Sequence, residues 1–555
     1  MQYSEWIVVK TNQEYLQYIS KSLNITLPLA QVLVSRGLKD INEIYSFLNP
    51  SIESIELSQV SGIYETVNII NEAIRAGIKI LINGDYDVDG LTSTAVLYDI
   101  LRKKGAQVFY HIPHRIKHGY GLSIASIEEA KKIGARLIIT VDCGIRDFEA
   151  VQYAKKEKIG VIITDHHEPL NLNGQLILPQ ALTVINPKID ENSRYSSLAG
   201  VGVAFMLALA LNSQIATEYL DLVTLGTYAD MVPLNTVNRA LIKNGWGLIE
   251  SGSRPSIKIL KDITGVNASS LKSFHLSFCL IPRLNAPGRI DHAGDVVKFL
   301  ISEEQSELEM LGQWLNEVNS LRQKAEEKIM EEVEEKLRVE FNDEPVIVLW
   351  GQWHPGVVGI VAGKLLERFS RPVFVFSLED ALAKGSARAP ANFNLQEMLI
   401  NTKDLLIRFG GHKQAAGVTL LKDNLLEFKE RLCNMVKNVS TKNILQLDAA
   451  VSFSDINEKV VEEIKLLEPF GEGNHEPVFG AKELTVVNLK KVGNNHLKMF
   501  LNQRGIFISA IGFDMAEEEI TEGSMIDAAF TPAINEWEGM KTLQLQLKAL
   551  RKAQR

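Results

Sequence analysis

Residues 78 to 94 read Ile-Lys-Ile-Leu-Ile-Asn-Gly-Asp-Tyr-Asp-Val-Asp-Gly-Leu-Thr-Ser-Thr, and the rest of the chain is interpreted around this stretch. Its first five residues are rich in β-branched side chains and predict a buried strand that ends in an Asn-Gly pair. Asp85, Asp87 and Asp89 follow at alternate positions. An extended backbone would place the three carboxylates on one side, where cations must offset their repulsion. Clustered oxygen atoms suit hard divalent ions such as Mg²⁺ and Mn²⁺.

Two other structures fit the same run of aspartates. One is an EF-hand calcium loop, which also opens with Asp-x-Asp-x-Asp-Gly, and the other is an acidic turn in solvent. The calcium loop needs a bidentate glutamate at its twelfth position, which here is Val96, and a helix before it where this chain has a strand. The calcium loop is therefore disfavoured, and the strands that follow also count against a simple turn.

Composition indicates a globular chain with several domains. The 555 residues are 46% hydrophobic and 23% charged, which fits about three to four domains. No signal peptide and no apolar run of ~18 residues is visible. Cys143, Cys279 and Cys433 are too scattered for a disulfide framework, so we expect a cytoplasmic protein without a membrane partner. The net charge of −9 does not exclude nucleic acid, because segments such as 326–340 concentrate acidic residues.

A regular alternation of strands and helices begins at residue 78. This pattern predicts an α/β domain with a parallel sheet, whose ligands gather at the carboxyl ends of the strands. The expected strands are 78–82, 106–112, 137–141 and 161–164, and the expected helices are 92–104, 123–133 and 147–158.

Several of these strands end in potential metal ligands. Asp142 follows the third strand, and Asp165, His166 and His167 follow the fourth. Alone, a His-His pair is more often structural, but its place beside other aspartates favours a functional role. Asp230 lies after an apolar helix, where it is either a further ligand or an ordinary capping or turn aspartate before a proline.

Residues 303–340 have apolar side chains spaced three and four apart, which predicts one helix of roughly 55 Å. A coiled-coil dimer is the alternative to a helix that connects two domains. We favour the connector, because a new β/α pattern follows directly at residue 345.

The region 341–440 predicts a second, smaller α/β domain. His354-Pro-Gly opens a helix, Ser386 and Arg388 lie in one short stretch, and Gly410-Gly-His-Lys-Gln-Ala-Ala-Gly417 forms another. Glycines let backbone N–H groups approach a phosphate, and arginine with a serine hydroxyl completes an anion site. One such stretch would be a weak signal, but three in one domain favour phosphate binding.

The remaining parts are the two ends of the chain. Residues 1–60 predict a mixed, largely helical segment without recognisable chemistry. Residues 441–555 predict a small five-stranded barrel of the oligonucleotide-binding type, locally rich in lysine and arginine. Lysines in solvent on any barrel would look the same. The expected strands are 484–489, 497–501, 506–511, 525–530 and 543–547.

With these motifs in view, the chain resembles the bacterial RecJ single-stranded-DNA exonucleases of the DHH phosphoesterase superfamily over essentially its whole length. Asn83 stands where histidine is common in that family, Ala389 where serine is usual, and His475 where proline is usual. The resemblance rests on residues 85–90, 141–144, 165–167, 229–233, 283–289, 353–362, 410–417 and 469–474.

The resemblance implies a DHH catalytic domain at 61–302, a connecting helix at 303–340, a DHHA1 domain at 341–440 and an oligonucleotide-binding domain at 441–555. It also implies hydrolysis with two Mn²⁺ or Mg²⁺ ions. Asp142 would bridge the ions, Asp85 and Asp87 would bind the first, and Asp89, His166 and Asp230 would bind the second. His167 would contact the scissile phosphate or assist proton transfer, and Asp165 would orient the histidines.

A substrate strand would be held by a further set of residues that the same resemblance supplies. Each arginine of the set has an ordinary alternative as a surface ion pair, and the tyrosine could stack on a base or pack in the core. The set is Arg115, Tyr120, Arg283, Asn285, Arg289, His354, Ser386, Arg388, Gly410, Gly411 and His412.

The function implied is degradation of single-stranded DNA from its 5′ end to mononucleotides, in recombination and repair. By family role, the partners are a single-strand-binding protein and a helicase, and we expect a monomer. The alternatives are a phosphodiesterase of short oligoribonucleotides, against which the extra barrel argues, and a catalytically silent scaffold that binds single strands. A silent relative would lack metal ligands, whereas every ligand position is filled here.

Overall fold

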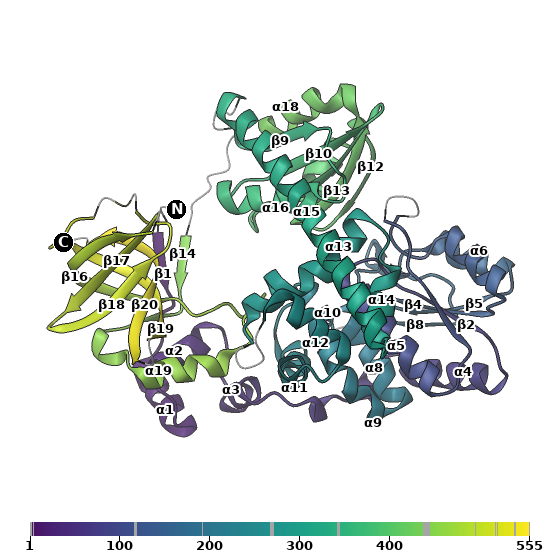
Figure 1. The fold of residues 1–555 in the computed structure, drawn as a ribbon, viewed down its shortest axis with the longest axis horizontal. Helices are drawn as coiled ribbons and strands as arrows, with labels where there is room; N and C mark the ends of the chain where they lie inside the picture. The colour runs from purple at the N-terminus through teal and green to yellow at the C-terminus, as the bar shows by residue number, and fades with distance from the viewer. Residues whose placement is uncertain are drawn as a thin grey trace. The chain divides into compact units, whose positions relative to one another are not determined.

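The structure is a computed structural model of the chain (Figure 1), and it describes residues 3, 5–115, 119–190, 193–266, 271–340, 344–436, 444–493, 495–516, 518, 520–537 and 540–553. The chain forms two compact units. Unit 1 comprises residues 1–55, 231–244 and 442–555, and unit 2 comprises 56–230 and 245–441. No helix within the described residues combines the length and the apolar stretch needed to cross a bilayer.

A five-stranded parallel sheet forms the centre of the first half of unit 2. Its strands lie in the order β3-β2-β4-β5-β8, and every neighbouring pair is parallel. The central strands β2, β4 and β5 are buried on both faces, as expected when helices cover both sides of a sheet. The strands are β2 (Ile80–Asn83), β3 (Val108–His111), β4 (Leu137–Val141), β5 (Gly160–Thr164) and β8 (Thr183–Ile185), and the helices between the first four are α5 (Val88–Lys103), α6 (Ile124–Ile133) and α7 (Phe148–Lys156).

Further helices of unit 2 pack against α5. They include α8 (Gly200–Leu211), α10 (Leu220–Ala229) and α14 (Gly294–Ile301). α8 is buried around almost its whole circumference, in keeping with its apolar sequence. These helices bring residues distant in the sequence to the carboxyl end of the parallel sheet.

The long helix α15 (Gln305–Glu340) packs against both α/β parts of unit 2. Near its start, Leu308 and Leu315 are buried where α15 meets α12 (Pro255–Thr264), α13 (Ile281–Ile290) and α14. Farther along, Ile329 and Val333 join the core beneath α16 (Val358–Phe369). The helix is thus a connector rather than half of a coiled coil.

The second sheet of unit 2 is mixed. Its order is β12-β13-β11-β10-β9, in which only the β9–β10 pair is parallel. α16 covers one face over β9, β10 and β11, and α18 (Leu425–Val436) contributes Phe428 and Leu432 to the core on the other. The strands are β9 (Ile347–Gly351), β10 (Val373–Glu379), β11 (Leu382–Arg388), β12 (Leu406–Gly411) and β13 (Ala415–Leu421).

Unit 1 contains a barrel of five long strands, closed by pairing of the first with the fourth. The strands are β16 (Phe479–Val492), β17 (His496–Gln503), β18 (Ile506–Gly512), β19 (Met525–Trp537) and β20 (Met540–Lys552). With the parallel sheet and the smaller mixed sheet of unit 2, the barrel confirms the predicted fold class.

The N-terminal residues belong to the same unit as the barrel. β1 (Glu5–Val8) pairs in parallel with β14 (Ile444–Leu447), and α1 (Gln13–Leu23) and α2 (Leu27–Ser35) share a core with the barrel through Ile19, Val32 and Phe530. Each of the two units therefore combines parts of several of the five predicted domains, and the predicted domain boundaries remain a prediction. The predicted boundaries near residues 341 and 440 lie outside the described residues.

One buried arginine ties several segments of unit 1 together. Arg239, in α11 (Thr236–Ser251), is fully buried, and its guanidinium lies over the Phe47 ring. It donates hydrogen bonds to the backbone carbonyls of Phe47, Leu466, Leu467 and Glu468 at 2.7 to 2.9 Å. A single side chain thus satisfies four carbonyl oxygens.

Candidate metal and substrate site

The three aspartates after β2 lie where the strand passes into α5. Asp85 follows the strand, Asp87 caps the helix by accepting a hydrogen bond from Gly90 N at 3.1 Å, and Asp89 lies in the first helical turn. The extended backbone considered for this segment is therefore wrong, because the capping aspartate starts the helix at Val88. Gly90 lies so close to Asp85 that an added β-carbon would be 2.7 Å from Asp85 Cβ.

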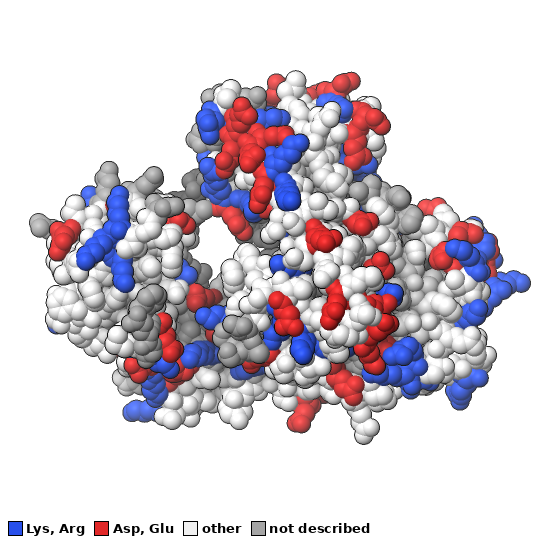
Figure 2. All heavy atoms as spheres, in the orientation of Figure 1, with Lys and Arg blue, Asp and Glu red and all other residues white. Residues whose placement is uncertain are grey.

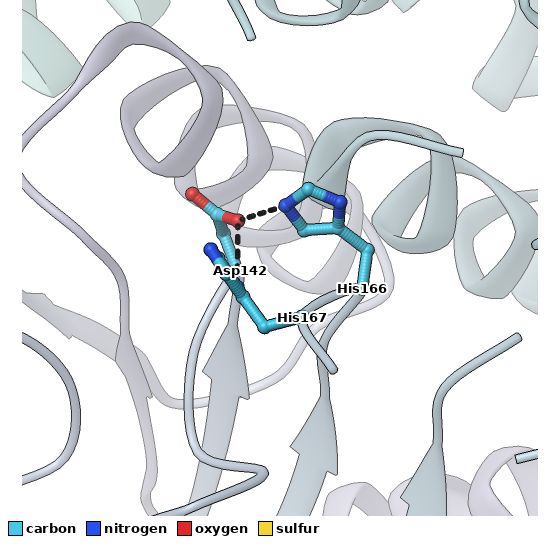
Figure 3. Close-up of side chains that lie close together, drawn as sticks. All are labelled: Asp142, His166 and His167. Carbon is cyan, nitrogen blue, oxygen red and sulfur yellow. Dashed lines mark ion pairs between the residues drawn. The ribbon is translucent and has the colours of Figure 1, made fainter. Parts of the chain in front are cut away.

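Asp142, His166 and His167 meet at the carboxyl ends of β4 and β5 (Figure 3). Nε2 of His166 lies 3.2 Å from Oδ1 of Asp142, and Nδ1 of His167 lies 3.9 Å from the same oxygen. The backbone of Asp142 has a φ of 60°, a left-handed conformation that is uncommon outside glycine and is often found at functional sites.

Two more carboxylates come within reach of His166. Asp230, at the C-terminal end of α10, places Oδ2 3.6 Å from His166 Nε2, and Asp89 places Oδ2 3.8 Å from it. The ligand atoms fall into three groups, each spanning no more than 4.8 Å. These groups are Asp85 with Asp87 and Asp142, Asp89 with His166 and Asp230, and Asp142 with His166 and His167.

The chemistry of this donor set fits divalent cations. Oδ1 of Asp85, Oδ1 of Asp142 and Nε2 of His166 are buried without a hydrogen-bond partner among the described residues. Buried polar atoms are rarely left so unless an ion or water satisfies them. Oxygen ligands with one or two imidazoles suit Mn²⁺ and Mg²⁺, with some preference for Mn²⁺.

The pKa values of the carboxylates also indicate a site for cations. Burial, followed by the charges of neighbouring carboxylates, raises the pKa of Asp85, Asp142 and Asp230 well above the usual range. Burial and the charge of Asp87 raise the pKa of Asp89 to about 7. Four acidic groups thus resist ionising side by side, and cations among them would relieve that cost.

The two histidines differ in their protonation. Burial and the charge of His167 lower the pKa of His166 to about 3, so its imidazole is neutral, as a metal ligand requires. Burial also acts against protonation of His167, but Asp165, 2.8 Å from Nδ1, raises its pKa above the usual value. Burial opposes ionisation of Asp165, yet its contact with His167 lowers its pKa to about 2.

Tyr120 completes the surroundings of His167. Its hydroxyl donates to the backbone carbonyl of Asp142 at 2.9 Å and lies 2.9 Å from Nδ1 of His167. The residue is 44% exposed, so it does not pack in the core, which was one of the two roles considered for it.

Several arginines of unit 2 lie within electrostatic range of Asp85 and Asp87. Basic and acidic side chains are interspersed over the face drawn in Figure 2. Inside unit 2, burial and the nearby charges of Arg115, Arg322 and Arg388 lower the pKa of Arg289 to about 10. Burial and Arg115 likewise lower the pKa of Arg388. Arg115, Arg289, Arg322 and Arg388 thus form an arginine cluster around Arg289. Their positive charges repel one another, and a bound anion would relieve the repulsion.

Small residues pair across the second sheet two positions from Arg388 along β11. Ser386, Gly417 and Gly410 pair in one row across β11, β13 and β12. A β-carbon added at Gly410 would meet nothing within 4 Å, and one added at Gly417 would approach only the Gly410 carbonyl oxygen. The row is thus open to a ligand that lies directly on the backbone.

The second α/β part also contains the predicted residues His354 and His412, and His412 directly follows the end of β12. Nδ1 of His354 accepts a hydrogen bond from Gly356 N at 3.1 Å, and burial lowers its pKa. Burial and the charges of His167 and Lys188 lower the pKa of His412, which places His412 within electrostatic range of the metal ligands. Gly411 has a φ of 143°, which glycine tolerates best.

Three family models match the chain: the DHH family N-terminal domain over residues 79–227, the DHHA1 domain over 343–438 and the RecJ OB domain over 447–549. The single-stranded-DNA-specific exonuclease RecJ of Bacillus subtilis (strain 168) is 36% identical over 556 residues, which is 98% of this chain and 70% of that protein. The chain belongs to the RecJ family.

Solved RecJ structures agree with this membership. The RecJ of Thermus thermophilus in complex with Mn²⁺ superposes with a TM-score of 0.87 at 29% identity, covering 99% of this chain and 80% of that one. Its complex with Mg²⁺ gives a TM-score of 0.81 at 28% identity and covers 99% and 79%.

In this RecJ family chain, α13 carries two of the predicted residues, Asn285 and Arg289, and packs against the aspartate segment 85–90, here called the metal loop. Asn285 accepts a hydrogen bond from Val88 N at 3.1 Å, and a β-carbon on Gly288 would clash with the carbonyl of Tyr86. Arg289, on the same helix, joins the arginine cluster. Arg283 instead donates to Oδ1 of Asn316 on α15 and to the Cys279 carbonyl, which holds its guanidinium at α15, near Arg322.

The N-terminus of α8 is a part of this RecJ site that sequence reasoning missed. The backbone N–H groups of Gly200 and Val201 each donate to one oxygen of Asp89, both at 2.7 Å. A helix N-terminus favours a carboxylate because its first N–H groups have no partner within the helix. The available signal was a Gly-Val-Gly triplet that opens an apolar helix.

Proposed function

We propose that this chain is a metal-dependent exonuclease that degrades single-stranded DNA from its 5′ end to mononucleotides, using Mn²⁺ or Mg²⁺, in recombination and repair. One observation carries the proposal. In this RecJ family chain, the cluster of carboxylates and histidines lies in the same unit as the arginine cluster.

The metal ligands have distinct proposed roles. Asp142 would bridge two ions, Asp85 and Asp87 would bind the first, and Asp89, His166 and Asp230 the second. The grouping of their ligand atoms within 4.8 Å supports this division. Two divalent ions, when bound, would supply Lewis-acid activation and offset the charge that develops on the phosphate during hydrolysis.

The chain's own side chains would position the reacting groups. Asp165 holds Nδ1 of His167 at 2.8 Å and favours its protonated form. His167 would thus present a positive, hydrogen-bonding ring to the scissile phosphate or assist a proton transfer. The Tyr120 hydroxyl, 2.9 Å from the same Nδ1, would help to keep that ring in place.

The arginine cluster supports a 5′-phosphate pocket. Arg115, Arg289 and Arg388 would bind the terminal phosphate together with Ser386, since arginine can hold two phosphate oxygens at once. The open row of Ser386, Gly417 and Gly410 would leave room for the terminal nucleotide. A pocket for a strand end gives an exonuclease its polarity.

The remaining roles come from the family resemblance alone. They are action in the cytoplasm as a monomer, with a single-strand-binding protein and a helicase as partners, and strand binding by the barrel of unit 1.

Cleavage of defined strands tests the proposal. The purified chain is incubated with Mn²⁺ or Mg²⁺ and a 3′-labelled single strand that carries a 5′-phosphate or a 5′-hydroxyl, beside a duplex and the Asp142→Ala variant. We expect progressive shortening from the 5′ end, absent from the duplex and the variant. Cleavage of RNAs of a few nucleotides but not of the long strand would favour the oligoribonuclease, and tight binding without any cleavage would favour the silent scaffold.

A further inference from the structure

The helix that carries Asn285 and Arg289 begins with a feature that the proposed mechanism does not use. η5 is a π-helix at His275–Leu280, and it runs without a break into α13 because Leu280 and Ile281 both have right-handed helical backbone angles. π-helical turns are rare and occur frequently at functional sites.

Two phenylalanines lie on the outer side of this segment. Phe274 is 59% exposed and Phe278 is 66% exposed, while Leu276 and Leu280 between and beyond them are buried. The two phenyl rings are stacked, with centroids 4.8 Å apart and planes 26° apart. Single exposed apolar side chains are common, but a stacked pair presents a continuous aromatic surface to water.

The surroundings of the pair connect it to the proposed active site. η5 packs against α10, whose C-terminal end carries Asp230, and leads into α13, where Asn285 binds the metal loop. Seven residues separate Phe278 from Asn285 and eleven separate Phe274 from it, which correspond to roughly 10 and 16 Å along a helix.

Positive charge accompanies the aromatic surface. Lys272 is exposed just before it, and Arg283 follows it on the same continuous helix. Burial and the charge of Arg322 lower the pKa of Arg283, so a second cation lies near. Aromatic rings with neighbouring cations are the combination that binds single strands, because unpaired bases stack on the rings and phosphates pair with the cations.

We propose that Phe274 and Phe278 form a stacking surface for unpaired bases of the strand that enters the metal site. The inference rests on the proposed function and deepens it, since it names residues that select single strands. Bases in a duplex are already stacked and paired, and their faces cannot reach such a surface.

The test compares strands with and without bases. The Phe274→Ala and Phe278→Ala variants and their combination are measured beside Tyr64→Ala, which removes a similarly exposed aromatic ring from α4 (Ile63–Arg75). Fluorescence anisotropy in EDTA gives the affinity for a 20-nucleotide oligothymidine and for an abasic strand with the same phosphates. Circular dichroism and thermal melting check that each variant is folded.

We expect the double variant to bind oligothymidine about 5- to 100-fold more weakly, while its affinity for the abasic strand stays unchanged. Its KM for cleavage of the 20-nucleotide strand should rise, and cleavage of a dinucleotide, which is too short to reach the pair, should match that of the unmodified chain. Equal losses on both strands, or no loss on oligothymidine, would overturn the inference.

This design separates the inference from the function on which it rests. If the unmodified chain cleaves no strand, the proposed exonuclease fails whatever the variants do. If it cleaves the long strand and the double variant behaves identically, only the stacking surface is rejected.

Discussion

Gly200 lies directly against Asp142, and a β-carbon added at Gly200 would come 2.5 Å from Oδ1 of that aspartate. The same glycine donates its N–H to Asp89 at 2.7 Å. A residue without a side chain is therefore needed where α8 meets Asp142 and Asp89, two proposed metal ligands. This relationship makes the N-terminus of α8 a support of the proposed metal site.

The Gly200→Ala variant should therefore lose metal affinity by about 10- to 100-fold, because displaced supporting groups misplace ligands by that much. A titration with Mn²⁺ that is monitored by calorimetry measures the loss of metal affinity. Gly363→Ala is the matched control, since its added β-carbon in α16 would meet nothing within 4 Å. Unchanged Mn²⁺ affinity in the Gly200→Ala variant would contradict the tight fit.

Removing one charge from the acidic cluster should weaken metal binding without lowering the melting temperature of the metal-free protein. In the metal-free protein, Asp142→Asn removes one of several buried carboxylates that repel one another, so its melting temperature should equal or exceed that of the unmodified chain. Saturating Mn²⁺ should raise the melting temperature of the unmodified chain much more than that of the variant.

Differential scanning calorimetry with EDTA and with Mn²⁺ measures both effects. Asp423→Asn, a change at an exposed position, serves as the control and should leave the Mn²⁺ response intact. A Mn²⁺ response of normal size in Asp142→Asn would argue against a ligand role for this aspartate.

The arginine cluster predicts a preference for a phosphorylated strand end. Arg388→Ala should lower kcat/KM for a 5′-phosphorylated strand by about 10- to 100-fold, the usual worth of a charge-assisted hydrogen bond. The 5′-hydroxyl strand should be cleaved almost as before. Arg431→Ala removes a partly exposed arginine from α18 that pairs with Asp404 and should change neither rate. Equal losses on both strands would place Arg388 elsewhere than at the end phosphate.

Asp147 predicts a pH-dependent stability. Burial raises its pKa to about 6, above its usual value, even though Leu122 N donates a hydrogen bond to its carboxylate. Between pH ~4 and ~6 the folded chain therefore binds more protons than the unfolded chain, and this group makes the free energy of unfolding fall as pH rises. The full cost, about 3 kcal/mol, is present above pH ~7.

The Asp147→Asn variant keeps an oxygen acceptor for Leu122 N but does not ionise. Its free energy of unfolding relative to the unmodified chain should thus increase from pH ~4 to pH ~7, by up to about 3 kcal/mol. Urea denaturation in EDTA at a series of pH values gives this difference. A difference that stays constant with pH would show that Asp147 does not titrate in this range.

Arg239 predicts a large loss of stability in unit 1. Arg239→Met leaves four backbone carbonyls without their donor, so we expect a loss of about 3 to 5 kcal/mol. Lys498→Met, at an exposed barrel position, should cost far less. Thermal denaturation compares the two, and similar melting temperatures would contradict the role of the arginine.

The sequence predicted four of the five strands of the parallel sheet, because each of the four is a short apolar run, but it missed β8 (Thr183–Ile185). The strand expected at 137–141 is β4, with the same ends. The start of α5 was misplaced, since Asp87 was interpreted as part of an extended segment when it caps the helix. A capping aspartate and a strand-end aspartate look alike until the hydrogen bond to Gly90 is seen.

The candidate site was predictable in its composition but not in its supports. Asp85, Asp142 and His166 follow recognisable strands, whereas the amides of Gly200 and Val201 depend on how α8 docks. Similarly, sequence reasoning left open whether Arg283 or Arg289 serves the anion pocket. A hydrogen bond to Asn316 holds the first of them at α15, and the second lies near Arg115 and Arg388.

The pairing of β1 with β14 has a consequence for synthesis of the chain. Residues 1–55 leave the ribosome long before residues 442–555, which supply the strand and barrel that complete their core. At the usual pace of translation, the N-terminal helices would wait roughly 20 to 80 s for their partners, while unit 2 can already fold. During that interval their apolar faces are natural clients for chaperones that bind nascent chains.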